Sequence, residues 1–322
     1  MSPLYQKVAL NRRTFLKTLT FALAASRAGA QTAPPQLVAP GVWFLLGDAH
    51  EGYCNNILIE MHDYLILVDA NYPGRAHELL HIIPTLSPKP LRWVFDTHAH
   101  RDHSYGNIVW TRAGAKTLAY KGVVDEMNRW EPGRWEATAA IRQDVRDTGE
   151  HDVQRPERTF SGRSLTMRDP GPHGRVVEFL HLGWAHTPGD GFVWLPHERI
   201  LCTGDAAVDG PRNKLLDAWI ANWPGVLDQV LALHPLHVLP GHGNAGGPEI
   251  LTGQRDFLLD LMAATKAQRA HGLKPEQMHI TLDGPAAHWV PTSPGGWQQD
   301  IDTAYLEISS GKPAGANPHV WR

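Results

Sequence analysis

The decisive stretch of sequence is Thr97-His98-Ala99-His100-Arg101-Asp102-His103, which follows the strand-like run Leu91–Phe95. Its polar groups are too dense for a buried core, because each unpartnered polar group buried in a core costs several kcal/mol. Zinc, in contrast, requires nitrogen and oxygen ligands that converge to about 2.0–2.2 Å. The spacing predicts that His98 and His100 face one metal ion and that Asp102 and His103 face a second. Taken alone, the motif also fits a solvated surface loop.

Three further motifs follow in chain order, each after a predicted strand. They are Gly183-Trp184-Ala185-His186-Thr187-Pro188-Gly189-Asp190, Leu201-Cys202-Thr203-Gly204-Asp205 and Leu239-Pro240-Gly241-His242-Gly243. The ordered set H-x-H-x-D-H, G-x-x-H-T-x-G-D, T-G-D and P-G-H-G resembles the pattern of the metallo-β-lactamase superfamily. The resemblance spans nearly the whole chain after its first thirty residues, about residues 38–310.

This resemblance implies an α/β fold, the four-layer αββα metallo-β-lactamase sandwich, with a metal site at one edge of its two sheets. It also implies seven metal ligands for two Zn²⁺ ions, with iron or manganese as other metals that such a site accepts. Carried over by position, the first ion is held by His98, His100 and His186, the second by Asp102, His103 and His242, and Asp205 bridges both.

The chemistry implied by the resemblance is hydrolysis. Two adjacent divalent ions bring the pKa of a bridging water toward neutrality, and the resulting hydroxide attacks an ester, lactone, thioester or amide-type bond in a small molecule. Weak β-lactam hydrolysis is compatible with the same site. Asp102 is the candidate catalytic residue, because it can orient that water and pass a proton to the leaving group. The alternative is a mononuclear iron sulfur (persulfide) dioxygenase of the same fold; a non-enzymatic scaffold has no need of all seven ligands.

Departures from the patterns of individual subfamilies narrow the range of activities that the resemblance implies. Position 100 is His where the di-iron flavoproteins of the family carry an acidic residue, and position 205 is Asp where one group of zinc β-lactamases carries Cys. The substrate-binding Lys of those β-lactamases is also absent, because Ala206-Ala207-Val208-Asp209 stands in its place. The pattern is closer to glyoxalase II-like proteins, lactonases and exported metallohydrolases of quinoprotein systems.

Several neighbouring residues are assigned supporting roles. Asp69 and Asp190 are expected to orient ligand-bearing loops rather than to bind metal directly. A substrate contact by His50, Tyr53 or Asn55 in an early hairpin loop is a weaker hypothesis. The segment Trp130–Trp135 is interpreted as packing, with a lid as the alternative. The two cysteines are expected to be buried and apolar, although a disulfide between Cys54 and Cys202 stays open.

Strand-like and helix-like runs alternate along the chain, as in an α/β layered fold. Helices are predicted at Gly74–Leu86, Leu215–Leu233, 248–271 and 298–308. The polar, Trp- and Arg-rich stretch at about 121–158 is predicted to be a helical insertion in the catalytic domain, which is taken as 38–322.

The first residues are interpreted as an export signal. Asn11-Arg12-Arg13-Thr14-Phe15-Leu16-Lys17, an apolar run and Ala28-Gly29-Ala30 resemble a twin-arginine signal peptide over 1–30, followed by a linker at 31–37. The expected partners are therefore the twin-arginine export machinery and a small-molecule substrate, and the expected location is periplasmic or secreted. The apolar run is too short for stable membrane insertion. A net charge of -3 without a basic block argues against nucleic acid.

Overall fold

A computed structural model describes residues 33–212 and 214–316. The predicted signal peptide and the first two residues of the predicted linker lie outside the described residues. Export therefore stays a prediction, which N-terminal sequencing of the mature protein tests. The described residues from Pro34 onward form one compact unit. Within the described residues, none of the helices combines the length and the apolar character needed to cross a membrane.

The first sheet contains seven strands that lie side by side in chain order. The first four strands pair antiparallel, and the pairs from the fourth strand onward are parallel. The strands are β1 (Gln36–Ala39), β2 (Val42–Leu45), β3 (Asn56–Glu60), β4 (Leu65–Val68), β5 (Leu91–Asp96), β6 (Lys116–Tyr120) and β7 (Arg158–Phe160). The parallel arrangement directs the C-terminal ends of β4, β5 and β6 to the same edge of the sheet.

The second sheet contains five strands in the order β12-β11-β10-β9-β8. Its pairs are antiparallel except β11 with β12, which run parallel. The strands are β8 (Ser164–Arg168), β9 (Val176–Leu180), β10 (Phe192–Leu195), β11 (Ile200–Gly204) and β12 (His237–Pro240). Two strands of this sheet, β11 and β12, therefore end beside each other and carry their following loops to a common place.

Alternating side chains explain why both faces of each sheet are covered. In β3, Ile57 and Ile59 face the space between the sheets, whereas Leu58 faces the outer helices. In the second sheet, Val193 packs between the sheets and Trp194 packs on the opposite face. Apolar residues on both sides of a strand are the signature of a sheet buried between two other layers.

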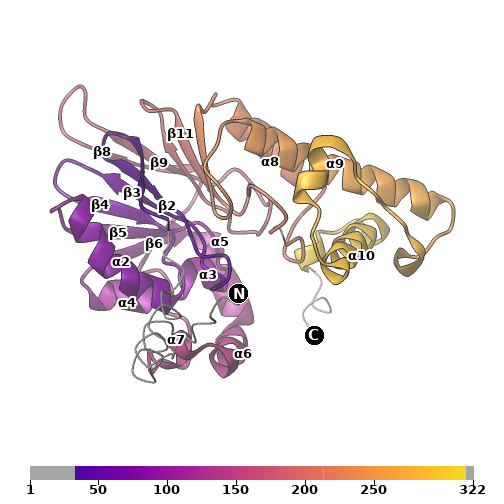
Figure 1. Cartoon of the computed structure of the whole chain (residues 1–322), viewed down its shortest axis with the longest axis horizontal. Coiled ribbons are helices and arrows are strands. Elements are labelled where there is room, and N and C mark those ends of the chain that lie inside the picture. The colour runs from indigo at the N-terminus through magenta and orange to yellow at the C-terminus, as the bar shows by residue number, and fades with distance from the viewer. Residues whose placement is uncertain (1–32, 213, 317–322) are drawn as a thin grey trace, which may run out of the picture. The chain divides into compact units, whose positions relative to one another are not determined.

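The outer layers are helical, and Figure 1 shows the order helix, sheet, sheet, helix. Leu79 of α2 and Trp110 of α4 pack on the first sheet, and Val226 of α8 and Phe257 of α9 pack on the second. The helices of these layers are α2 (Pro73–Leu86), α3 (Arg101–Ser104), α4 (Asn107–Arg112), α8 (Trp223–Leu231), α9 (Glu249–Ala270) and α10 (Pro294–Ser310), with short 3-10 turns η1 (Pro275–Gln277), η2 (Gly284–Trp289) and η3 (Ala314–Ala316). The fold is thus the αββα sandwich that the sequence predicts.

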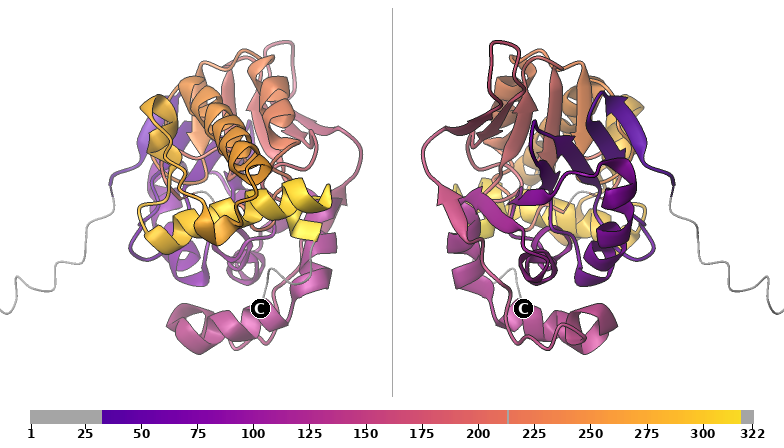
Figure 2. Two further views of the ribbon diagram at one scale, coloured as in Figure 1. Left: turned by 90° about the vertical axis from the view of Figure 1, so that its right-hand side faces the viewer. Right: turned by 90° about the vertical axis from the view of Figure 1, so that its left-hand side faces the viewer.

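The stretch predicted to be a helical insertion contains α5 (Lys121–Trp130), α6 (Gly133–Ile141) and α7 (Gln143–Arg146), and β7 begins at its last residue. Figure 2 shows these helices at one end of the sandwich, where the chain is coloured magenta. Trp135 is only 1% exposed and its ring lies 4.7 Å from that of Tyr105. Trp135 therefore packs in the protein interior, as the sequence indicates, and is not part of a lid.

Several boundaries differ from the sequence prediction, among them that of α10, which begins at Pro294 rather than at 298. The helix predicted at Leu215–Leu233 begins only at Trp223, because its apolar residues up to Ile220 belong to an irregular buried segment and Pro224 fits only the first turn of a helix. The strand β1 begins at Gln36, inside the predicted linker, because it pairs with β2 through Gln36 and Leu37.

One buried carboxyl group predicts how stability depends on pH. Asp300 of α10 is 3% exposed, and burial raises its pKa to about 8. An unfolded aspartate has a pKa of about 3.9, so between these values the folded chain keeps a proton that the unfolded chain has lost. The free energy of unfolding therefore falls as the pH rises from about 4 to about 8.

We expect Asp300→Asn to remove this dependence. In thermal unfolding scans, the Tm of the variant minus the Tm of the unmodified protein should increase steadily from about pH 4 to about pH 8. The exposed Asp260→Asn change on α9 is the matched control and should give a Tm difference that does not vary with pH. A constant Tm difference for Asp300→Asn would contradict the assignment.

Candidate metal centre

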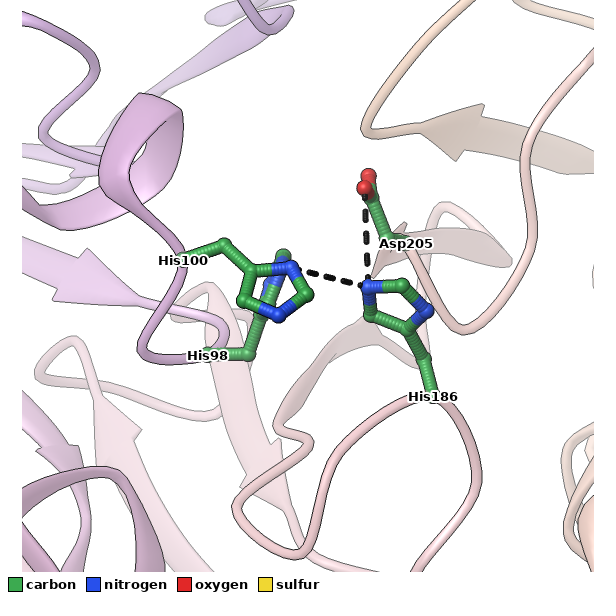
Figure 3. Close-up of side chains that lie close together, drawn as sticks. All are labelled: His98, His100, His186 and Asp205. Carbon is green, nitrogen blue, oxygen red and sulfur yellow. Dashed lines mark hydrogen bonds and ion pairs between the residues drawn. The ribbon is translucent and has the colours of Figure 1, made fainter. Parts of the chain in front are cut away.

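Loops at the ends of four strands bring the predicted ligands together. His98 and His100 follow β5, and Asp102 and His103 lie in the short helix α3 directly after them. From the second sheet come His186, in the loop between β9 and β10, Asp205 after β11 and His242 after β12. All seven residues predicted from the sequence thus reach one edge of the sandwich. Figure 3 shows four of them, His98, His100, His186 and Asp205, pointing toward one another.

The first group consists of His98, His100, His186 and Asp205, whose potential ligand atoms all lie within 4.8 Å of one another. His186 Nε2 lies 3.0 Å from His100 Nδ1 and 3.8 Å from Asp205 Oδ2. The ring of His98 lies 4.7 Å from that of His100 and 5.0 Å from that of His186. Three imidazoles and a carboxylate converging from both sheets match the donor set of a four-coordinate zinc site.

The second group consists of Asp102, His103 and His242. His242 Nε2 lies 3.0 Å from Asp102 Oδ2, and His103 Nε2 lies 3.7 Å from the same oxygen. Asp205 stands between the groups, because its Oδ1 is 3.3 Å from His103 Nε2 and its Oδ2 is 3.6 Å from His242 Nε2. This position of Asp205 is the one that the predicted bridging role requires.

Hydrogen bonds to carboxylates on the outer side fix the orientation of two imidazoles, those of His103 and His100. Asp69 Oδ2 lies 2.8 Å from His103 Nδ1, and Asp69 Oδ1 accepts the backbone N–H of Thr97. Asp217 Oδ2 lies 2.7 Å from His100 Nε2. In each case the nitrogen that faces a carboxylate carries the proton, and the other ring nitrogen keeps its lone pair for a metal ion. Asp69 therefore occupies the orienting position that the sequence predicts.

The loops that carry the second-sheet ligands are braced separately. The Asp190 carboxylate accepts hydrogen bonds from the backbone N–H groups of Ala185 and Thr187 and from the Thr187 hydroxyl, which fixes the loop around His186. Asn55, a candidate substrate contact on sequence grounds, instead donates to the carbonyls of Pro240 and Gly243 and is 2% exposed. Its amide nitrogen holds the loop that carries His242.

Gly241 allows the last loop to pass directly beside Asp205. A Cβ atom at this position would lie 2.2 Å from Asp205 Oδ1 and 2.8 Å from the carbonyl carbon of Gly204. Only glycine permits so close an approach of backbone to a side chain. The P-G-H-G motif thus brings His242 to the centre because it removes a side chain one residue earlier.

The residues fit a bound metal ion. His98 Nε2, His103 Nε2 and Asp205 Oδ1 are among the buried side-chain atoms of the described residues that lack a hydrogen-bond partner. Buried polar groups in proteins normally have such a partner, and a metal ion would supply one here. Burial lowers the pKa of His98 well below its usual range and that of His186 to about 3, so both rings are neutral and able to ligate. Burial opposes ionisation of Asp205, but His242 and His103 outweigh it and lower the pKa of this carboxyl group.

The pKa of His103 shows that the electrostatic potential at the second group of ligands is negative. Burial alone disfavours a charge on His103, but nearby acidic groups, Cys54 and the carboxyls of Asp205 and Asp69 among them, raise its pKa well above the usual range. The same acidic groups favour a bound cation, which would take the place of a proton on His103 Nε2. Cys54 and Cys202 are both buried and unpaired, so the disulfide that the sequence left open does not form here.

Sequence reasoning missed Asp217. It lies in the stretch predicted to be part of a helix, twelve positions after Asp205, where nothing in the local pattern distinguishes it from a surface aspartate. In the structure Asp217 is 2% exposed and contacts both His100 and, at 3.4 Å, Arg134 of α6. Only the fold brings these three side chains together.

Comparison with known proteins agrees with this site. Over 115 residues the chain is 32% identical to a metallo-beta-lactamase type 2 of Bacteroides fragilis, covering 34% of this chain and 45% of that protein. Over 210 residues it is 25% identical to a metallo-beta-lactamase type 2 of Bacillus cereus, covering 63% and 72%. The solved structure of a stereoselective inverting sec-alkylsulfatase from Pseudomonas sp. matches with a TM-score of 0.64 at 19% identity, covering 89% of this chain and 52% of that one.

The chain therefore spans about half the length of the Bacteroides fragilis relative and of the alkylsulfatase. At 19% identity, the likeness to the alkylsulfatase concerns the fold alone. The sequence model of the metallo-beta-lactamase superfamily matches residues 50–247, which is more than half of the chain and includes all seven predicted ligands. The chain belongs to the metallo-beta-lactamase superfamily.

Proposed function

We propose that this protein is a dinuclear zinc hydrolase that cleaves an ester, lactone, thioester or amide-type bond in a small molecule. The observation that carries the proposal is the position of Asp205, whose two oxygens face imidazoles of both ligand groups. A single-metal site does not need a carboxylate shared in this way. The metallo-beta-lactamases to which this chain is similar in sequence are hydrolases by name, which supports the reaction class.

Two divalent ions bound by these residues would supply an activated water molecule and polarise the scissile bond. The protein's own contribution to proton transfer comes from Asp102. Its side chain is 25% exposed, against 8% for Asp205, so it is the carboxylate that reaches solvent and an incoming substrate. His242 fixes one oxygen of Asp102, and the other is free to take a proton from an attacking water and pass it to the leaving group.

The iron-dependent dioxygenase is the weaker candidate. It needs only the three imidazoles of His98, His100 and His186 around one ion and leaves the second group of ligands without a role. The second group is nevertheless complete, with His103 buried and oriented by Asp69. Phosphodiester cleavage ranks lower too, because the sequence offers no basic cluster for a polyanionic substrate.

Elemental analysis and a substrate panel test the proposal. We expect about two zinc ions per purified chain, because the shared carboxylate of Asp205 is placed to bind two ions. We also expect turnover of at least one lactone, ester, thioester or amide. The panel also contains a β-lactam, a phosphodiester and a sec-alkyl sulfate, the last because the alkylsulfatase covers most of this chain. One iron per chain, with oxygen uptake on a persulfide and no hydrolysis, would move the protein to the dioxygenase class.

A further inference from the structure

His100 depends on Asp217 for its orientation, and Asp217 lies in an irregular segment, residues 217–221, with no regular secondary structure of its own. Asp217 Oδ2 accepts the proton of His100 Nε2 at 2.7 Å, which leaves His100 Nδ1 to face His186. A loop that carries such a partner must itself be held in place, because a displaced carboxylate frees the imidazole to rotate. The 217–221 segment is held from three directions.

The C-terminal helix provides the first and strongest support. Glu307 of α10 is 4% exposed, and its carboxylate accepts the backbone N–H groups of Ile220 at 2.9 Å and Ala221 at 2.7 Å. The same carboxylate also accepts the N–H of Ala314 at 3.4 Å. Hydrogen bonds from backbone N–H groups to a buried carboxylate are charge-assisted and strong, so this group fixes the 217–221 segment to the end of α10.

The last described turn, η3, provides the second support. The N–H of Gly315 donates to the Ala218 carbonyl at 3.3 Å, and a Cβ atom at Gly315 would lie 2.4 Å from the carbonyl oxygen of Asp217. Glycine is therefore required for the turn to lie directly against Asp217. Arg129 of α5 donates to the carbonyls of Gly315 and Ala316 and covers the turn from the side of the inserted helices.

The third support comes from the loop that carries another ligand. Trp184 Nε1 donates to the Asp217 carbonyl at 2.7 Å, and the N–H of Trp219 donates to the carbonyl of Ala185 at 2.9 Å. The 217–221 segment therefore connects the loop of His186 on one side with the C-terminal lobe, residues 249–316, on the other. Both of these neighbours lie within the same compact unit as the ligands.

We propose that the C-terminal lobe positions the first metal site, with Glu307 and Gly315 acting as positioning residues for His100 through Asp217. Both residues lie beyond residues 50–247, the part matched by the superfamily model. The inference rests on the two-metal centre of the proposed function. It predicts a site-selective effect, because Asp217 contacts His100, while His103 and His242 of the second group have other partners.

The test is a zinc titration of metal-depleted protein in competition with a chromophoric chelator, which resolves two stepwise dissociation constants. Asp217→Asn and Asp69→Asn serve as references for weakening the first and the second site. We expect Glu307→Gln and Gly315→Ala to follow the Asp217→Asn pattern, raising one dissociation constant by about 10- to 100-fold and leaving the other unchanged. Glu276→Gln, on an exposed turn of the same lobe, is the matched control and should equal the unmodified protein.

Unchanged constants in Glu307→Gln, even with a lower Tm, would overturn the inference, because Glu307 would then only stabilise the fold. Equal weakening of both sites would overturn it as well. If either variant does not fold, Glu307→Asp replaces it, because this change keeps the charge and shortens the side chain. It should raise the same dissociation constant by a smaller factor. The proposed function is tested separately, by the zinc stoichiometry of the unmodified protein. Binding of a single zinc ion to the unmodified protein would contradict the dinuclear hydrolase. In that case the effect of Glu307→Gln on the single dissociation constant would still decide the positioning role.

Discussion

Asp205→Asn is expected to abolish hydrolysis and to leave the protein unable to hold two zinc ions. The change keeps the shape of the side chain but removes the charge shared by the two ligand groups, whose imidazoles lie 3.3 to 3.8 Å from the carboxylate oxygens. Loss of a partner that merely orients a ligand costs about 10- to 100-fold in metal affinity or activity, and loss of a shared ligand should exceed that range. The measurements are kcat/KM on the best panel substrate and zinc per chain.

Asp228→Asn is the matched control, because Asp228 is exposed and paired only with Arg255 on the surface. That variant should keep two zinc ions and full activity. An Asp205→Asn protein with normal zinc content and normal turnover would exclude a bridging role for Asp205.

Asp102→Asn should lower kcat by about 10²- to 10⁴-fold, the range typical for a group that transfers a proton in the transition state. The amide can still accept a hydrogen bond from His242 Nε2, so the geometry of the second group is largely kept. It cannot take a proton from water at neutral pH. In the folded protein burial opposes ionisation of Asp102, but His103 and His242 outweigh it and hold the pKa of this carboxyl group well below its usual range. The native side chain is therefore ionised and has a lone pair for the proton, which the amide lacks.

Zinc content distinguishes this role from simple ligand loss, so kcat should be compared only between preparations with two zinc ions per chain. The exposed Asp125→Asn change on α5 is a suitable control for charge removal. Full turnover in Asp102→Asn protein with both metals bound would rule out proton transfer by Asp102.

The sequence indicates which side chains converge at the candidate metal centre, because these residues lie in short motifs at strand ends. Each motif carries its own signal, for example the glycine before His242 that makes room for Asp205, and the order of the motifs indicates the sandwich. The role of Asp69 could also be predicted from the sequence, since this residue directly follows a buried strand. These features depend on residues that are neighbours along the chain, so no tertiary information is needed to find them.

What the sequence does not reveal depends on contacts between distant residues. Asp217 meets His100 across 117 positions, and Glu307 meets Ile220 across 87. The apolar spacing of residues 215–222 suggests a helix, yet tertiary hydrogen bonds from Glu307 and Trp184 hold the segment in an irregular conformation. Local propensity is a weak guide where a buried charge fixes the backbone.

The division of the seven ligands between two sheets has a consequence for the living cell. Four come from loops of the first sheet and three from loops of the second, so bound ions cross-link the two halves of the sandwich. Ligand binding to the folded state alone adds RT ln(1 + [L]/Kd), about 2.7 kcal/mol at a hundredfold excess of free ion over Kd. If the protein binds zinc as proposed, free zinc would raise its free energy of unfolding, and metal depletion would make it easier to unfold and to degrade.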